Sequence, residues 1–110
     1  MGSLVIRDLE AEDYDWAASV LNEHWGSTRV VTRGRIHDLK NLKGFVAELD
    51  GEPAGLLTYI IYGRECELIT MNAFERGEGI GTALLNSLTE VARDRECRGI
   101  WLITTNDNLD

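Results

Sequence analysis

Three glycines at alternate positions, Gly77, Gly79 and Gly81, stand where an extended segment gives way to a helix. The apolar run 68–74 before them has the composition of a strand, and apolar side chains recur at helical spacing from Ile80 to Ala92 after them. Glycine lets the backbone approach a ligand closely, and the first N–H groups of a helix lack partners within it. The helix dipole favours negative charge at the same point. The segment predicts a phosphate-binding turn; the alternative is a turn that only starts the helix.

Two common nucleotide-binding motifs do not fit this segment. A P-loop ends in Gly-Lys-Ser/Thr, whereas the sequence here is Gly81-Thr82-Ala83, without the lysine that reaches the terminal phosphates. A dinucleotide fingerprint that starts at Gly77 would need its third glycine at position 82, where threonine stands. The missing lysine argues against a nucleoside triphosphatase.

Composition limits the class of protein. The 110 residues are 44% hydrophobic and 27% charged, which predicts one globular domain, 1–110, with a modest core. A net charge of −8 argues against nucleic acid as a partner, and no apolar run is long enough to cross a membrane. Cys66 and Cys97 form no C-x-x-C pair, which favours reduced thiols and a cytoplasmic location. His24 and His37 lack ligand partners at metal-binding spacing, so we expect no metal site.

The elements that must position the glycine segment follow from periodicity and turn signals. We expect a strand over 4–9, a helix over 11–23, and a shorter helix capped by Thr32 whose buried side carries Ile36 and Leu39. Gly34 weakens the prediction of that second helix. Segments 44–49 and 53–60 flank Asp50-Gly51 and predict a β-hairpin, followed by a strand over 66–73.

The last part of the chain predicts a βαβ unit. A helix from the glycine segment to about Glu96 joins the strand 66–73 to a strand over 100–105, so these strands should be parallel with a right-handed crossover. The full order is β-α-α-β-β-β-α-β, an α/β fold with a mixed sheet.

The segment 76–81 resembles the acetyl-CoA signature of the GCN5-related N-acetyltransferases (GNAT), Arg/Gln-x-x-Gly-x-Gly/Ala. Arg76, Gly79 and Gly81 stand in its three fixed positions. The predicted order is also similar to that family's, from its first strand to its fifth, so the resemblance covers essentially the whole chain. It implies a GNAT-like acyl-CoA N-acyltransferase fold with acetyl-CoA as the cofactor.

The resemblance also implies which residues bind the cofactor. In this family the fourth and fifth strands splay apart, the pantetheine arm pairs with backbone on the fourth, and the loop amides take the pyrophosphate. Asn108 stands where an asparagine near the cofactor is often found, and Asn106 either bonds the cofactor or only turns the chain. The matching positions are Met71, Asn72, Ala73, Arg76, Gly77, Glu78, Gly79, Ile80, Gly81, Thr82, Asn106 and Asn108.

Catalytic and acceptor residues are implied in the same way. Family members often draw the base from a carboxylate on the fourth strand, so Glu67 and Glu65 are the candidates, with Glu67 preferred because it lies further into the strand. The alternative is that both are solvated charges. Trp25 and Arg29 lie on the segment that shapes the acceptor pocket in this family, with a core or surface role as the alternative. Tyr59 is assigned to the substrate site or to packing.

The sequence has no counterpart of the family's last helix, its acid tyrosine, or its final two strands. We therefore expect a C-terminally truncated chain with impaired turnover. We expect the exposed apolar strand 100–103 to favour a homodimer or pairing with a second chain. The expected function is an N-acetyltransferase that moves acetyl from acetyl-CoA to a primary amine of a small molecule or protein. The alternative is a non-catalytic GNAT-derived module that binds CoA or assembles.

Overall fold

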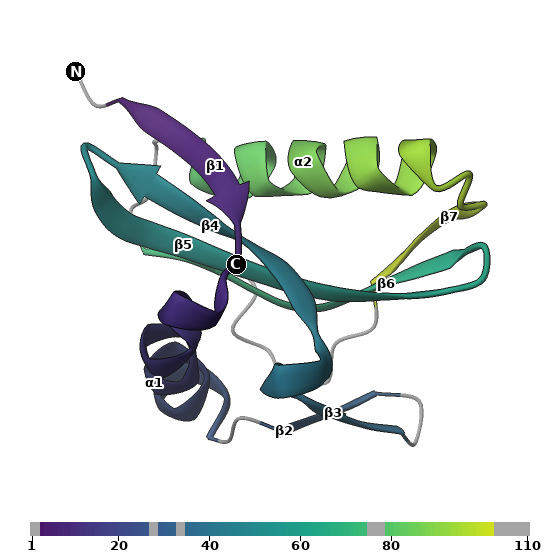
Figure 1. Cartoon of the computed structure of the whole chain (residues 1–110), viewed down its shortest axis with the longest axis horizontal. Helices are drawn as coiled ribbons and strands as arrows, with labels where there is room; N and C mark the ends of the chain where they lie inside the picture. The colour runs from purple at the N-terminus through teal and green to yellow at the C-terminus, as the bar shows by residue number, and fades with distance from the viewer. Residues whose placement is uncertain (1–2, 27–28, 33–34, 75–78, 103–110) are drawn as a thin grey trace.

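The computed structural model describes residues 3–26, 29–32, 35–74 and 79–102 (Figure 1). Five strands form the main sheet, in the order β1-β4-β5-β6-β7. They are β1 (Leu4–Asp8), β4 (Lys43–Leu49), β5 (Glu52–Tyr62), β6 (Glu65–Ala73) and β7 (Gly99–Leu102). Neighbouring strands are antiparallel except β6 and β7, which are parallel, as expected for the strands of a βαβ unit.

One helix covers each face of the sheet (Figure 1). Helix α2 (Ile80–Asp94) buries an apolar stripe of Ile80, Leu84, Leu88 and Ala92 against β4, β5 and β6. Helix α1 (Tyr14–Trp25) lies on the opposite face, where Ala17, Val20 and Leu21 pack with Leu56 of β5. Both clusters follow the 3.6-residue spacing of amphipathic helices, and each fully buried leucine or isoleucine contributes about 1.5–3 kcal/mol.

The β4–β5 hairpin forms as the sequence predicts. Asp50 and Gly51 both adopt positive φ, 54° and 85°, which is the requirement of a tight hairpin turn. Leu49 pairs with Glu52 directly across that turn. Further from the turn the register shifts between Ala47 and Glu48, so the turn and this irregularity together set which side chains of the hairpin point toward α2.

The predicted second helix is wrong. In its place the chain forms a two-stranded antiparallel sheet of β2 (Arg29–Thr32) and β3 (Arg35–Asp38), with Val31 opposite Ile36. A 3-10 helix, η2 (Leu39–Asn41), follows, and the Asp38 carboxylate caps it by accepting a bond of 3.1 Å from the Lys40 N–H. Three of the four residues of β2 are β-branched (Val30, Val31 and Thr32), and their restricted χ1 favours extended backbone over helix.

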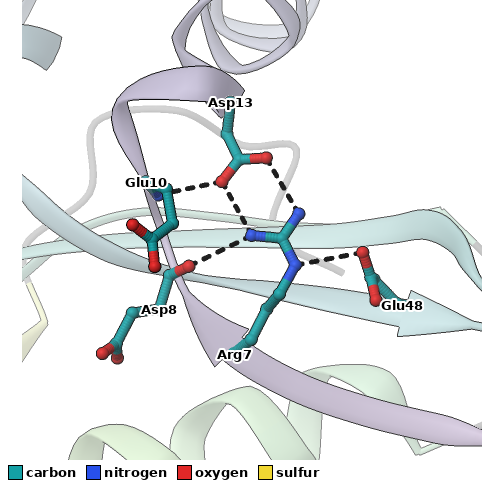
Figure 2. Close-up of polar contacts among 5 residues, drawn as sticks. All are labelled: Arg7, Asp8, Glu10, Asp13 and Glu48. Atoms are coloured by element: carbon teal, nitrogen blue, oxygen red, sulfur yellow. Dashed lines mark hydrogen bonds and ion pairs between the residues drawn. The ribbon is translucent and has the colours of Figure 1, made fainter.

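An ion-pair network joins β1 to the start of α1 (Figure 2). The Arg7 guanidinium donates two hydrogen bonds to the Asp13 carboxylate, of 2.7 and 2.8 Å, and a third of 3.0 Å to Glu48 on β4. Asp13 also accepts a bond from the Glu10 N–H, which closes a capping box around the 3-10 helix η1 (Ala11–Asp13). The network therefore fixes the angle at which the chain leaves the sheet and enters α1.

Candidate functional site

The glycine turn predicted from the sequence lies between the end of β6 and the start of α2. Gly79 adopts φ +70° and ψ 18°, a left-handed conformation that favours glycine, and it occupies the cap position of α2. The Ala83 N–H makes a 2.9 Å bond to the Gly79 carbonyl, so the N–H groups of Ile80, Gly81 and Thr82 precede the first intrahelical bond. Gly79 has no side chain to cap this turn, so these groups and the helix dipole favour an anion. Arg76, Gly77 and Glu78 lie outside the described residues.

The position of this turn depends on close contact between α2 and β5. Ile80 is 1% exposed and lies over Gly55, where an added Cβ would come within 2.7 Å of the Ile80 Cγ2 atom. The same Cβ would also approach the Asn72 carbonyl oxygen to 3.1 Å. Gly55 is thus a positioning residue that the sequence analysis missed. An isolated glycine inside an apolar strand is the signal that could have identified it.

The C-terminal half of β6 continues past its pairing with β7. The last registered pair within the described residues is Leu68 with Leu102, whereas Met71, Asn72 and Ala73 pair with β5 on the other side. Phe74 anchors the end of the strand, since its N–H bonds to the Ala54 carbonyl at 2.9 Å. These contacts hold the predicted cofactor strand directly before the glycine turn.

Phe74 also links the end of β6 to α1. Its ring meets Trp16 edge to face, with ring centroids 6.2 Å apart and planes at 89°. Such pairs contribute about 0.5–1.5 kcal/mol beyond the area they bury. The helix on the far side of the sheet therefore contacts the residue at which the glycine turn begins.

Of the two predicted carboxylates, Glu67 is the buried one. Only 3% of Glu67 is exposed, and its neighbours in register are Ile60 on β5 and Trp101 on β7. Because Tyr59 packs in the cluster beneath α2, alternation along β5 places Ile60, and with it Glu67, on the face away from α2. Glu65 lies on the same face at the start of β6, where it accepts a 2.9 Å bond from the Trp101 indole N–H.

Tyr59 belongs to the core. It is stacked on Phe45 with centroids 5.5 Å apart and lies beneath α2, on the face opposite Glu67. Burial raises the pKa of its hydroxyl. The structure thus places Tyr59 in the packing beneath α2, and its assignment to the substrate site stays a prediction. Trp25 ends α1 and Arg29 begins β2, while their side chains lie outside what the structure describes, as do Asn106 and Asn108.

Cys66 is not a candidate nucleophile. It is fully buried beneath α2, and burial, with a smaller contribution from Cys97, raises the pKa of its thiol to about 11. Both cysteines are free. Across the described part of the chain, histidine, cysteine and carboxylate side chains form no group of three that could bind a metal ion. Burial and the raised pKa of the thiol therefore argue against thiolate chemistry at Cys66.

A mixed five-stranded sheet with a helix on each face and a glycine turn after β6 defines an acyltransferase-type fold. The model of the acetyltransferase (GNAT) family matches residues 5–110. The chain belongs to this family.

Two curated relatives come from Bacillus subtilis (strain 168). The chain is 40% identical to the uncharacterized protein YdhI over 89 residues, which are 80% of this chain and 56% of that protein. It is 38% identical to the uncharacterized protein YxbD over 96 residues, 86% of this chain and 60% of that protein. The chain thus spans somewhat more than half the length of these relatives.

Solved structures support the same fold. A ribosomal-protein-alanine N-acetyltransferase from Brucella melitensis superposes with a TM-score of 0.74 at 21% identity, over 91% of this chain and 79% of that one. An aminoglycoside N-acetyltransferase in complex with CoA gives a TM-score of 0.74 at 15% identity, over 98% and 81% of the two chains. Within the described residues, neither helix has the length and apolar character that a membrane crossing requires.

Proposed function

We propose that the protein transfers an acetyl group from acetyl-CoA to a primary amine of a small molecule or protein. The observation that carries this proposal is the left-handed Gly79, which follows β6 in the chain and immediately precedes the first turn of α2. The resemblance of residues 76–81 to the acetyl-CoA signature of the GNAT family supports this turn as the binding site of the cofactor's pyrophosphate.

The residues present fit such a cofactor. Among the described residues, an added Cβ at Gly79 would meet nothing within 4 Å, and at Gly81 only the Met71 Cε atom at 3.9 Å, so these residues leave space for a ligand beside the backbone. The N–H groups of Ile80, Gly81 and Thr82 would bind the pyrophosphate, together with the loop of Arg76, Gly77 and Glu78. Backbone groups of Met71, Asn72 and Ala73 would pair with the amides of the pantetheine arm. Acetyl-CoA supplies an acetyl group activated as a thioester.

Glu67 is the proposed base. An amine attacks only in its neutral form, so a carboxylate that accepts the amine proton, directly or through a water molecule, makes attack possible. Burial of Glu67 on the face away from α2 keeps the carboxylate from being an ordinary solvated charge. Glu65, already bonded by the Trp101 indole, would instead add negative charge that attracts a cationic acceptor.

Calorimetric titration with acetyl-CoA tests the cofactor site. Gly81 has helical backbone and open space at its Cβ, so Gly81→Leu should leave the free energy of unfolding unchanged or raise it by up to about 1 kcal/mol. The same leucine would occupy the space proposed for the pyrophosphate and abolish binding. Asn86→Leu, which adds a leucine at an exposed position further along α2, is the matched control and should bind as the wild type does. Equal binding by both variants would refute the site.

Turnover tests the base. An aminoglycoside and a peptide with N-terminal alanine are suitable first acceptors, because structural neighbours are named for these substrates. With any acceptor that is acetylated, Glu67→Gln should lower kcat by about 10²–10⁴-fold while acetyl-CoA affinity is kept. An unchanged kcat would remove Glu67 from the mechanism.

A non-catalytic assembly module is the second candidate, and one observation favours it. Trp101 is 46% exposed on β7, which within the described residues pairs only with β6. Such an edge is suited to pairing with a second copy of the chain. Light scattering that shows a dimer, lost in Trp101→Lys, together with no binding of acetyl-CoA, would favour assembly over catalysis.

A further inference from the structure

Two buried hydroxyl groups meet in the middle of the sheet. The Thr58 and Thr70 Oγ1 atoms lie 2.6 Å apart, and both residues are fully buried. They are register partners on β5 and β6. Within the described residues, the buried polar or charged side chains are Thr58, Thr70 and Glu67. Each threonine satisfies the other in surroundings where a lone hydroxyl would be costly.

The pair lies next to a β-bulge. Thr58 pairs with Thr70, but the next pair along is Tyr59 with Leu68, which leaves Ile69 as an extra residue on β6. The bulge resolves a conflict in the pattern of side chains. Leu68 and Met71 both pack toward α2 although they are three residues apart, which regular alternation would forbid.

Apolar side chains alone do not fix the position of this bulge. Leucine and isoleucine flank it on both strands, at Leu57 and Ile60 of β5 and at Leu68 and Ile69 of β6, and these residues pack on either face. If the bulge moved by one residue toward Met71, Thr58 would pair with Ile69, and both hydroxyls would remain buried without their partner. The cost of two unsatisfied buried hydroxyls therefore opposes a shift of the bulge in this direction.

We propose that Thr58 and Thr70 are positioning residues for the cofactor. Their hydrogen bond fixes the bulge, and the bulge sets the direction of Met71, Asn72 and Ala73 and of the glycine turn that follows. This inference rests on the proposed function, because it takes the end of β6 as the strand that pairs with the pantetheine arm. The Thr58–Thr70 contact lies on the face of the sheet away from α2 and controls the shape of this strand.

Valine has the shape of threonine without the hydroxyl, so valine variants test the proposal. Thr58→Val and Thr70→Val alone should each lower stability, because one hydroxyl remains buried without its partner. The double variant removes both hydroxyls and should recover most of that stability. Its affinity for acetyl-CoA should nevertheless be about tenfold weaker than the wild type, and the amides of Ile69–Ala73 should exchange faster with deuterium.

Thr58→Ser is the conservative control, since it keeps the hydroxyl and should keep both affinity and slow exchange. A double valine variant with wild-type affinity and wild-type exchange at Ile69–Ala73 would overturn the inference. Failure of the proposed function has a different signature. The wild-type chain would then not bind acetyl-CoA, while the exchange comparison would still decide whether the threonine pair fixes the bulge.

Discussion

A single methyl group at Gly55, on the face of the sheet that α2 covers, should disturb the cofactor site through the first turn of that helix. In Gly55→Ala the new Cβ would lie 2.7 Å from the Ile80 Cγ2 atom and 3.2 Å from the Leu84 Cδ1 atom, closer than packed atoms approach. The Asn72 carbonyl at 3.1 Å limits movement of the strand, so the first turn of α2 must lift. Overpacking of this kind costs about 1–3 kcal/mol. In a domain of this size, each kcal/mol lowers Tm by roughly 4–8 °C.

The affinity for acetyl-CoA should fall in the folded Gly55→Ala protein, because Gly79, Ile80 and Gly81 would all move. Gly44→Ala is the matched control. Its Cβ would meet the Leu57 carbonyl oxygen at 2.5 Å, a clash at least as severe, but on β4 and away from α2. Thermal unfolding and calorimetric titration should therefore show both variants destabilised and only Gly55→Ala impaired in binding.

Relief of the clash provides a second check. Ile80→Leu moves the branch from Cβ to Cγ and so removes the Cγ2 atom that the new methyl group meets. The Gly55→Ala/Ile80→Leu variant should recover part of the lost stability and affinity. If Gly55→Ala binds acetyl-CoA as tightly as the wild type, the idea that the α2–β5 contact positions the glycine turn is wrong.

Two further perturbations concern α1. Arg7 and the Glu10 N–H lower the pKa of Asp13, so folded protein holds this carboxylate ionised to lower pH than unfolded protein does. The stability that this network contributes should be complete above the ordinary aspartate pKa of about 3.9, and it should be lost as the pH falls through the lower pKa of the folded state. Urea unfolding at pH 6 and pH 3 should therefore show a smaller loss of stability at pH 3 in Asp13→Asn than in the wild type. In a Trp16→Leu, Phe74→Leu double-mutant cycle, urea unfolding should give a coupling of about 0.5–1.5 kcal/mol. Additive effects would show that the ring contact contributes nothing.

Local signals predicted much of the fold. The Asp50-Gly51 turn, the amphipathic stripe of α2 and the βαβ unit each depend on residues close in sequence, and each forms as expected. The predicted helix around Ile36 does not form, because one capping threonine and two apolar residues at helical spacing favour a helix less than the β-branched residues 30–32 favour a strand. A short segment carries too few residues for periodicity to distinguish a helix from two strands.

The parts of the candidate site that escaped prediction depend on register. The sequence identifies Glu67 as a candidate because it lies on the strand before the glycine turn. Its burial depends on the register that pairs it with Ile60 of β5 and places both side chains on the face of the sheet away from α2. Alternation carried back along β6 from Met71 would have placed Glu67 beneath α2, because the bulge at Ile69 is invisible in an apolar run. One extra residue therefore decides on which side of the sheet the proposed base lies.

The same extra residue connects the two halves of the proposed chemistry. Ahead of the bulge, β6 points Glu67 away from α2; after it, the strand packs Met71 beneath α2 and ends at the glycine turn. A regular strand could not do both, since moving Glu67 to its present face would turn Met71 outward. The buried Thr58–Thr70 contact lies next to the point where the alternation of side chains along β6 shifts by one residue. The proposed base and the proposed cofactor strand are thus set by one local irregularity, and a variant that shifts it should disturb both together.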